Sequence, residues 1–163
     1  MATDIDEIRS TLNGLIETLK DGEEGFRTSA EKLRDRETAE EFRSFAQQRS
    51  RMASDLQAHV SRIGGEPATS GSFTGALHRG WTDLVAALSG NNDHAILEEA
   101  ESGEDAAVKN YRDAVTKDLP SDIRAVVETQ YGEVLRTHNT VRSLRDASKP
   151  MTRTSGGGNT TVF

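Results

Sequence analysis

Hydrophobic residues recur every three or four positions through four long stretches of the chain. This spacing is typical of amphipathic α-helices, in which one apolar face packs against the rest of the protein. We predict the four helices at residues 5–33, 38–63, 93–116 and 121–148. The pattern therefore indicates an all-α fold whose core lies between the apolar faces of four helices.

Polar residues at the expected helix ends support these boundaries. The segment Thr38-Ala39-Glu40-Glu41 forms a capping box, which places the start of the second helix near Thr38. Asp93 and Ser121 are expected as the N-caps of the third and fourth helices. Gly64-Gly65 should end the second helix.

The connection from Glu66 to Asn92 is much longer than the loops that join antiparallel neighbours in a helix bundle. Its start is rich in Pro, Ser and Gly, whereas residues 73–88 regain helical spacing, so we expect a loop followed by a short helix. Such a connection can cross from one end of the bundle to the other. The prediction is two helical hairpins joined by a crossover, in one domain at residues 1–147. The tail, residues 148–163, has no periodicity and is expected to be disordered.

Several polar side chains interrupt the apolar faces. The segment from Leu97 to Tyr111 places two carboxylates on its inward stripe, where an unpaired buried charge would be costly. The other helices contribute further polar groups, including a cation on the second helix. The full set of candidate residues is Glu23, Gln48, Arg49, Glu101, Glu104, Gln130 and His138.

Composition narrows the classes of function. The chain has 163 residues, a formal net charge of −7 and no cysteine. The negative charge disfavours binding to nucleic acid or to an anionic membrane. The absence of cysteine excludes disulfides, thiolate nucleophiles and Cys-ligated metal sites. Neither a signal peptide nor a membrane-spanning run is evident, so we expect a cytoplasmic protein.

Two interpretations of the interior polar residues remain open. In the first, they form a polar network in a non-enzymatic bundle, which needs no cofactor. In the second, Glu23, Glu101, Glu104 and His138 hold iron or manganese in an oxidase or iron-storage protein. None of the four histidines has a glutamate three residues before it, and Arg49 offers a cation where a metal site needs ligands. These two features favour the network, and pairing with Arg49 would be expected to lower the pKa of Glu104.

The chain also resembles the bacterial ferritin-like four-helix-bundle proteins that are classified as a domain of unknown function. The resemblance covers roughly residues 5–147 and rests on the segments LNGLIETLKDGEEGFRTSAE, FAQQRSRMASDLQAHVSRIGG, GSFTGALHRGWTDLVAAL, EEAESGEDAAVKNYRDA and LP-x-x-IR-x-x-V-x-x-QY-x-x-V-x-x-x-H-x-x-VRSLRD. It implies a ferritin-like fold, a bacterial cytoplasmic protein and a link to stress response. It implies no established reaction. A homodimer and an unidentified protein partner are compatible with this prediction.

Overall fold

A computed structural model describes residues 4–72 and 92–148 of the chain, and these residues form four α-helices without any β-strand. The helices are α1 (Ile5–Lys32), α2 (Arg36–Arg62), α4 (Asp93–Val115) and α5 (Ser121–Ala147). The prediction of an all-α protein with four long helices is therefore confirmed. Each helix has one buried face, as the spacing of its hydrophobic residues requires.

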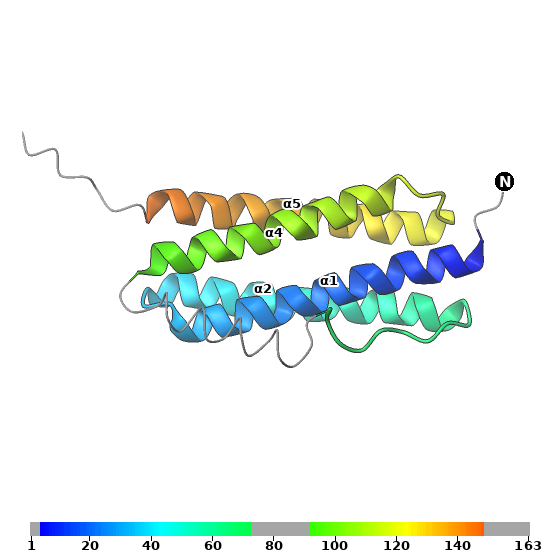
Figure 1. The fold of residues 1–163 in the computed structure, drawn as a ribbon, viewed down its shortest axis with the longest axis horizontal. Helices are drawn as coiled ribbons and strands as arrows, with labels where there is room; N and C mark the ends of the chain where they lie inside the picture. Colours follow the sequence, from blue (N-terminus) through cyan, green and yellow to red (C-terminus); the bar gives the residue numbers. More distant parts are fainter. Residues whose placement is uncertain (1–3, 73–91, 149–163) are drawn as a thin grey trace, which may run out of the picture.

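The helices lie side by side as two antiparallel pairs, α1 with α2 and α4 with α5 (Figure 1). The first pair meets the second mainly through α1 and α4, with a smaller contact between α2 and α5. Short turns at residues 33–35 and 116–120 join the members of each pair. All four helices are nearly parallel or antiparallel to one long axis (Figure 1).

Helix α2 ends and α4 begins at opposite ends of this four-helix domain (Figure 1). The carbonyl of Ile63 accepts a 3.1 Å hydrogen bond from Nε of Arg9, near the start of α1. Asp93 lies at the other end, where its carboxylate accepts from the backbone N–H groups of Arg34 and Asp35. Residues 63–92 thus connect the two ends. The short helix expected within residues 73–88 lies outside the described residues, as does nearly all of the tail expected at 148–163.

The N-caps of three helices lie one to three residues before the positions expected from the sequence. Helix α2 begins at Arg36, because the carboxylate of Asp35 accepts from both the backbone N–H and the hydroxyl of Thr38, at 3.0 and 2.6 Å. Thr38 is therefore a first-turn residue and not the N-cap. Asp93 and Ser121 were also expected as caps, but each is the first residue of its helix.

The buried hydrophobic side chains form two clusters along the long axis. The larger cluster takes residues from all four helices, including Leu19, Met52 and Ala107. The smaller cluster contains Phe26, Phe42 and other residues of all four helices toward the α1–α2 turn. Arg49 on α2 and Glu104 on α4 are buried charged residues. Along its helix, each lies between residues of the smaller cluster and residues of the larger cluster. These residues define the candidate site.

Candidate functional site

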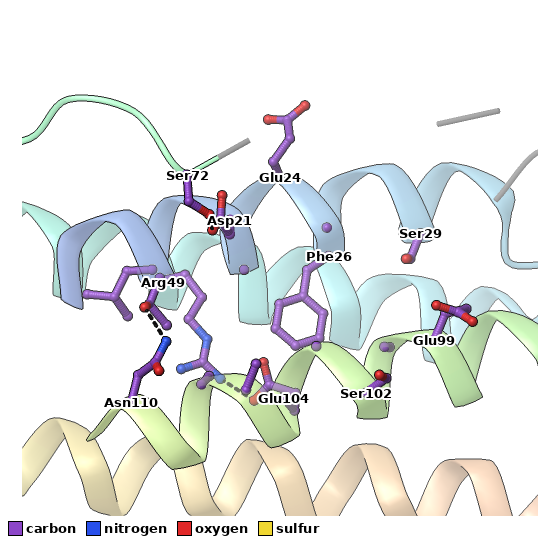
Figure 2. Close-up of a pocket in the computed structure, with 18 residues that line it drawn as sticks. Asp21, Glu24, Phe26, Ser29, Arg49, Ser72, Glu99, Ser102, Glu104 and Asn110 are labelled. Atoms are coloured by element: carbon purple, nitrogen blue, oxygen red, sulfur yellow. Dashed lines mark hydrogen bonds and ion pairs between the residues drawn. The ribbon is translucent and has the colours of Figure 1, made fainter. Parts of the chain in front are cut away.

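Arg49 and Glu104 form an ion pair inside the four-helix domain. Nη2 of Arg49 lies 2.6 Å from Oε2 of Glu104, and the two side chains are only 1% and 3% exposed. Arg49 comes from α2 and reaches between α1 and α4 to meet Glu104 on α4 (Figure 2). Its Cζ atom also lies 5.7 Å from the centre of the Phe26 ring, within range of a cation–π contact.

The pair leaves part of the guanidinium without a partner. Nε and Nη1 of Arg49 are buried and donate to no hydrogen-bond acceptor among residues 4–72 and 92–148. An arginine carries five N–H donors and remains protonated, so a buried guanidinium normally has most of them satisfied. A single carboxylate therefore compensates the charge of Arg49 but not its hydrogen-bonding capacity.

Burial raises the pKa of Glu104 above its usual range, while the nearby Arg49 guanidinium opposes that shift and His138 opposes it further. The sequence analysis expected the opposite direction from pairing with Arg49. That expectation was wrong, because removing a carboxylate from water is more costly than one partly satisfied cation can compensate.

Gln130 lies in a second buried group. Its side-chain oxygen accepts a 2.8 Å hydrogen bond from the hydroxyl of Tyr111, and its amide nitrogen donates to the backbone carbonyl of Met52 at 3.1 Å. Gln130 thus links α5 to both α4 and α2. Burial raises the pKa of Tyr111, so this hydroxyl stays protonated and can donate.

The remaining candidates on α2, α4 and α5 lie nearer the surface. Gln48 accepts a 3.1 Å hydrogen bond from the hydroxyl of Thr137. Glu101 pairs with Arg145, near the end of α5. Nε2 of His138 lies 2.6 Å from Oδ1 of Asp105. Each of these contacts joins α5 to one neighbouring helix.

Glu23 is the one candidate whose described contacts are all local. Its carboxylate pairs with Lys20 at 3.2 Å and with Arg27 at 2.7 Å, and all three residues belong to α1. None of the described hydrogen bonds or ion pairs connects Glu23 with Arg49 or Glu104. The seven candidates are therefore distributed over several small groups.

The three acids and one histidine proposed as metal ligands do not all converge in this arrangement. Glu104 is held by Arg49, and Glu23 by the two bases of its own helix. A different set does converge on the α4–α5 face: one ligand atom from each of Glu101, Asp105 and His138 lies within 4.8 Å of the others. Arg145 competes with a metal for Glu101 in this cluster.

Sequence reasoning missed several partners of the candidate residues, namely Tyr111 as a donor, Asp105, Thr137 and Arg145. Tyr111 ends the segment whose inward stripe carries Glu101 and Glu104; it is fully buried, and a buried tyrosine hydroxyl usually needs a partner. That signal could have found the contact with Gln130. Asp105 and Arg145 lie beside the apolar stripes, where helical periodicity carries no information about contacts between helices.

The fold and site define an all-α protein with four packed helices and an interior Arg–Glu pair. The chain belongs to the family described as a domain of unknown function (DUF2383), whose match covers residues 7–117. No curated protein matches the chain. Within residues 4–72 and 92–148, no helix combines the length and apolar character needed to cross a membrane.

Proposed function

We propose that the protein is a non-enzymatic, ferritin-like four-helix bundle that acts by binding other molecules in the bacterial cytoplasm, in connection with stress response. The observation that carries the proposal is the contact between Arg49 and Glu104. In a ferritin-like metal site, an interior glutamate at such a position would be a ligand. Here a guanidinium supplies the positive charge, so the interior acid has a structural role.

The arrangement of the helices supports the ferritin-like part of this proposal. Ferritin-like proteins combine two helical hairpins with one long connection between opposite ends of the bundle. The positions of Ile63 and Asp93 at opposite ends agree with that topology. The bacterial, cytoplasmic and stress-related parts rest on the sequence resemblance.

The alternative is an iron or manganese carboxylate protein, and one observation favours it. Glu101, Asp105 and His138 offer two carboxylate oxygens and an imidazole nitrogen, a donor set that suits divalent transition metals. This cluster would use Glu101 and His138 from the predicted set, with Asp105 in addition. A metal there would act as a Lewis acid when bound.

Metal retention separates the two proposals. The purified apo-protein is incubated anaerobically with ferrous iron or with manganese and desalted, and the bound metal is measured by elemental analysis. The non-enzymatic proposal expects less than about a tenth of a metal ion per chain, well below the occupancy of a specific site. Three variants are compared with the wild type: Glu104→Gln, His138→Ala and, as a surface control, Glu128→Gln.

Each pattern of retention has one interpretation. Stoichiometric retention that Glu104→Gln abolishes would overturn the structural role of the interior acid. Retention that His138→Ala abolishes, but that Glu104→Gln leaves unchanged, would establish the α4–α5 cluster as a metal site and reject the metal-free proposal. Stoichiometric retention that survives all three variants would mean that the metal needs neither Glu104 nor His138, and it would also contradict the metal-free proposal.

The oligomeric state that we propose is a homodimer. Among the described residues, Ile5 is the one large hydrophobic side chain that is exposed, so a dimer formed by them would have a mostly polar interface. Light scattering on the purified chain would give its mass directly. A monomer mass at micromolar concentration would reject the dimer.

A further inference from the structure

A groove of about 370 Å³ runs between α1 and α4, and Figure 2 shows the side chains that line it. Its lining lies within residues 18–29 of α1 and residues 99–110 of α4, apart from Arg49 and Ser72. The apolar side chains of the wall are Leu19, Phe26, Ala100 and Ala107. The wall also contains glycines, and a β-carbon at Gly25 or Gly103 would have no described neighbour within 4 Å. The groove therefore has room for large hydrophobic side chains.

The connection that leaves α2 follows α1 toward this groove. The backbone N–H of Ala68 donates to Oδ1 of Asn13 at 2.8 Å, in the first half of α1. Further along the connection, the hydroxyl of Ser72 donates to Asp21, in the second half of α1. Ser72 and Asp21 both line the groove. The connection thus advances along α1 and reaches the groove at residue 72.

The connection ends beyond the other end of the groove. The carboxylate of Asp93 accepts hydrogen bonds of 2.9 and 3.0 Å from the turn that follows α1. Between Asp21 and its last residue, Lys32, α1 rises about 17 Å at about 1.5 Å per residue. The groove lies along this part of α1. The chain between residues 72 and 92 must therefore cover the length of the groove.

Residues 73–91, which lie outside the described residues, have a length and a sequence that suit this path. A helix over residues 73–88 measures about 24 Å, and residues 89–91 remain to reach Asn92. The large hydrophobic residues recur at the spacing of one helical face. They are Phe73, Leu77, Trp81, Leu84 and Leu88. Such a stripe gains stability by leaving water for an apolar surface, which the groove offers.

Tethering and charge favour this segment over other occupants. The segment is joined to the described chain at both ends, and a short tether gives an effective concentration of roughly millimolar. A second copy of the chain would have to compete with it. Three acids line the groove and would repel an anionic partner. Residues 73–91 contain a single acid, Asp83, together with Arg79.

We propose that the groove between α1 and α4 is the docking site of residues 73–91 of the same chain, which pack into it as a helix with Trp81 against its apolar wall. The proposal goes beyond the function proposed above, because it assigns this face to an internal contact and leaves the other faces for binding. It is independent of metal binding, since Glu101, Asp105 and His138 do not line the groove.

The chain suits a test by NMR, because Trp81 is its only tryptophan and it has no cysteine. A nitroxide attached to Ser102→Cys would lie at the exposed rim of the groove on α4. The Trp81 indole N–H resonance of the full chain should lose most of its intensity, relative to the same sample after the nitroxide is reduced. The control carries the nitroxide on Asp122→Cys, in the first turn of α5 at the opposite end of the domain from the α1–α2 turn (Figure 1). It should leave the resonance unchanged.

A mixture of two chains tests whether the docking is intramolecular. Isotope-labelled chain without a nitroxide is refolded together with an equal amount of unlabelled chain that carries the nitroxide on Ser102→Cys. The indole resonance of the isotope-labelled chain should keep its intensity. A loss of intensity would mean that the segment docks on a second copy.

Two combined substitutions test whether the groove itself is the docking site. Gly25→Leu and Gly103→Leu place side chains in the groove from opposite walls, and replacing a helical glycine should not lower the stability of the four-helix domain. With the nitroxide on Ser102→Cys, the indole resonance of this variant should regain intensity, and acrylamide should quench Trp81 fluorescence more strongly. Gly14→Leu is the matched control, because Gly14 is a glycine of α1 with open space around its β-carbon that does not line this groove. It should behave as the wild type does.

Four results would overturn the proposal. An indole resonance that the nitroxide on Ser102→Cys leaves unchanged would place Trp81 away from the groove. Equal loss of intensity from the nitroxide on Asp122→Cys would mean that the segment has no fixed docking site. Loss of intensity in the mixed sample would make a second copy the occupant. Undiminished loss in the leucine-filled variant would mean that Trp81 approaches α4 outside the groove.

Discussion

Arg49 is a buried cation whose removal would strand its partner. In Arg49→Met, the carboxylate of Glu104 would stay buried without the guanidinium that now lies 2.6 Å away. Breaking a buried ion pair in this way costs about 3–5 kcal/mol, whereas replacing both partners with apolar residues is often neutral or stabilising. We therefore expect Arg49→Met to lose about 3–5 kcal/mol and Arg49→Met with Glu104→Leu to recover most of it. Urea denaturation at neutral pH would measure both, and an Arg49→Met variant as stable as the wild type would contradict this account.

The protonation of Glu104 should be visible in the pH dependence of stability. Burial raises its folded pKa above the ordinary value of 4.5, so its contribution to the free energy of unfolding is fully present below the unfolded pKa and is lost as pH rises through the folded pKa. The free energy of unfolding of the wild type, relative to that of Glu104→Gln, should therefore fall as pH rises from about 4 to about 8. Urea denaturation across this range would measure the difference.

The exposed Glu128 provides a control for this pH series, because it pairs with Arg124 only at 3.6 Å on the surface of α5. Glu128→Gln should show little change relative to the wild type over the same pH range. If the free energy of unfolding of the wild type instead rose with pH relative to that of Glu104→Gln, the folded pKa of Glu104 would be lowered. The attraction of Arg49 would then outweigh the effect of burial.

The residues of the site differ in how far the sequence could predict them. Positions 49 and 104 interrupt continuous apolar stripes on helices that each bury one face, so the period of the helix alone places both side chains inward. Glu101 and His138 lie at the edges of their stripes, where a small rotation of the helix decides between core and surface. Their partners Arg145 and Asp105 depend on how α4 is rotated against α5, and periodicity within one helix carries no such information.

At the scale of the element, helix bodies were predictable and helix ends were less so. The body of α2 is predicted by many apolar residues that share one helical spacing. Its start depends on which of two nearby polar residues accepts hydrogen bonds from the backbone N–H groups of the first turn. Thr38 and Asp35 both satisfy the local rule, and the structure selects Asp35. The length of the connection between α2 and α4 was predictable, since it follows from the bounds of the helices that flank it.

The cap of α2 provides an element-scale prediction. Hydrogen bonds from the hydroxyl and the backbone N–H of Thr38 lower the pKa of Asp35, so its stabilising contribution should be present above the unfolded pKa and lost as pH falls through the folded value. Asp35→Ala should lower the thermal midpoint by a few degrees at neutral pH and by less in acid. Asp122→Ala is the control, because Asp122 lies in the first turn of α5 without a described capping bond. Equal shifts for the two variants would show that capping is not the cause.

At the scale of the whole molecule, the two helical pairs share one core. The larger hydrophobic cluster draws on all four helices, and Leu56 of α2 is fully buried within it. A substitution at Leu56 should destabilise both helical pairs, because both pairs pack their side chains in this cluster. Gln130 strengthens the same coupling by bonding Tyr111 and the carbonyl of Met52 from a third helix.

We therefore expect Leu56→Ala to cost about 2–5 kcal/mol and to lower the protection of the slowest-exchanging amides of α4 and α5 as much as those of α1 and α2. Hydrogen exchange followed by NMR would measure this residue by residue. Ile5→Ala provides the control, since Ile5 is exposed and should change neither stability nor protection appreciably. Loss of protection confined to α1 and α2 would mean that the pairs open independently and that the contact between α1 and α4 is too weak to join them. Equal loss would show that the interior layer formed by Arg49 and Glu104 lies within a single cooperative unit.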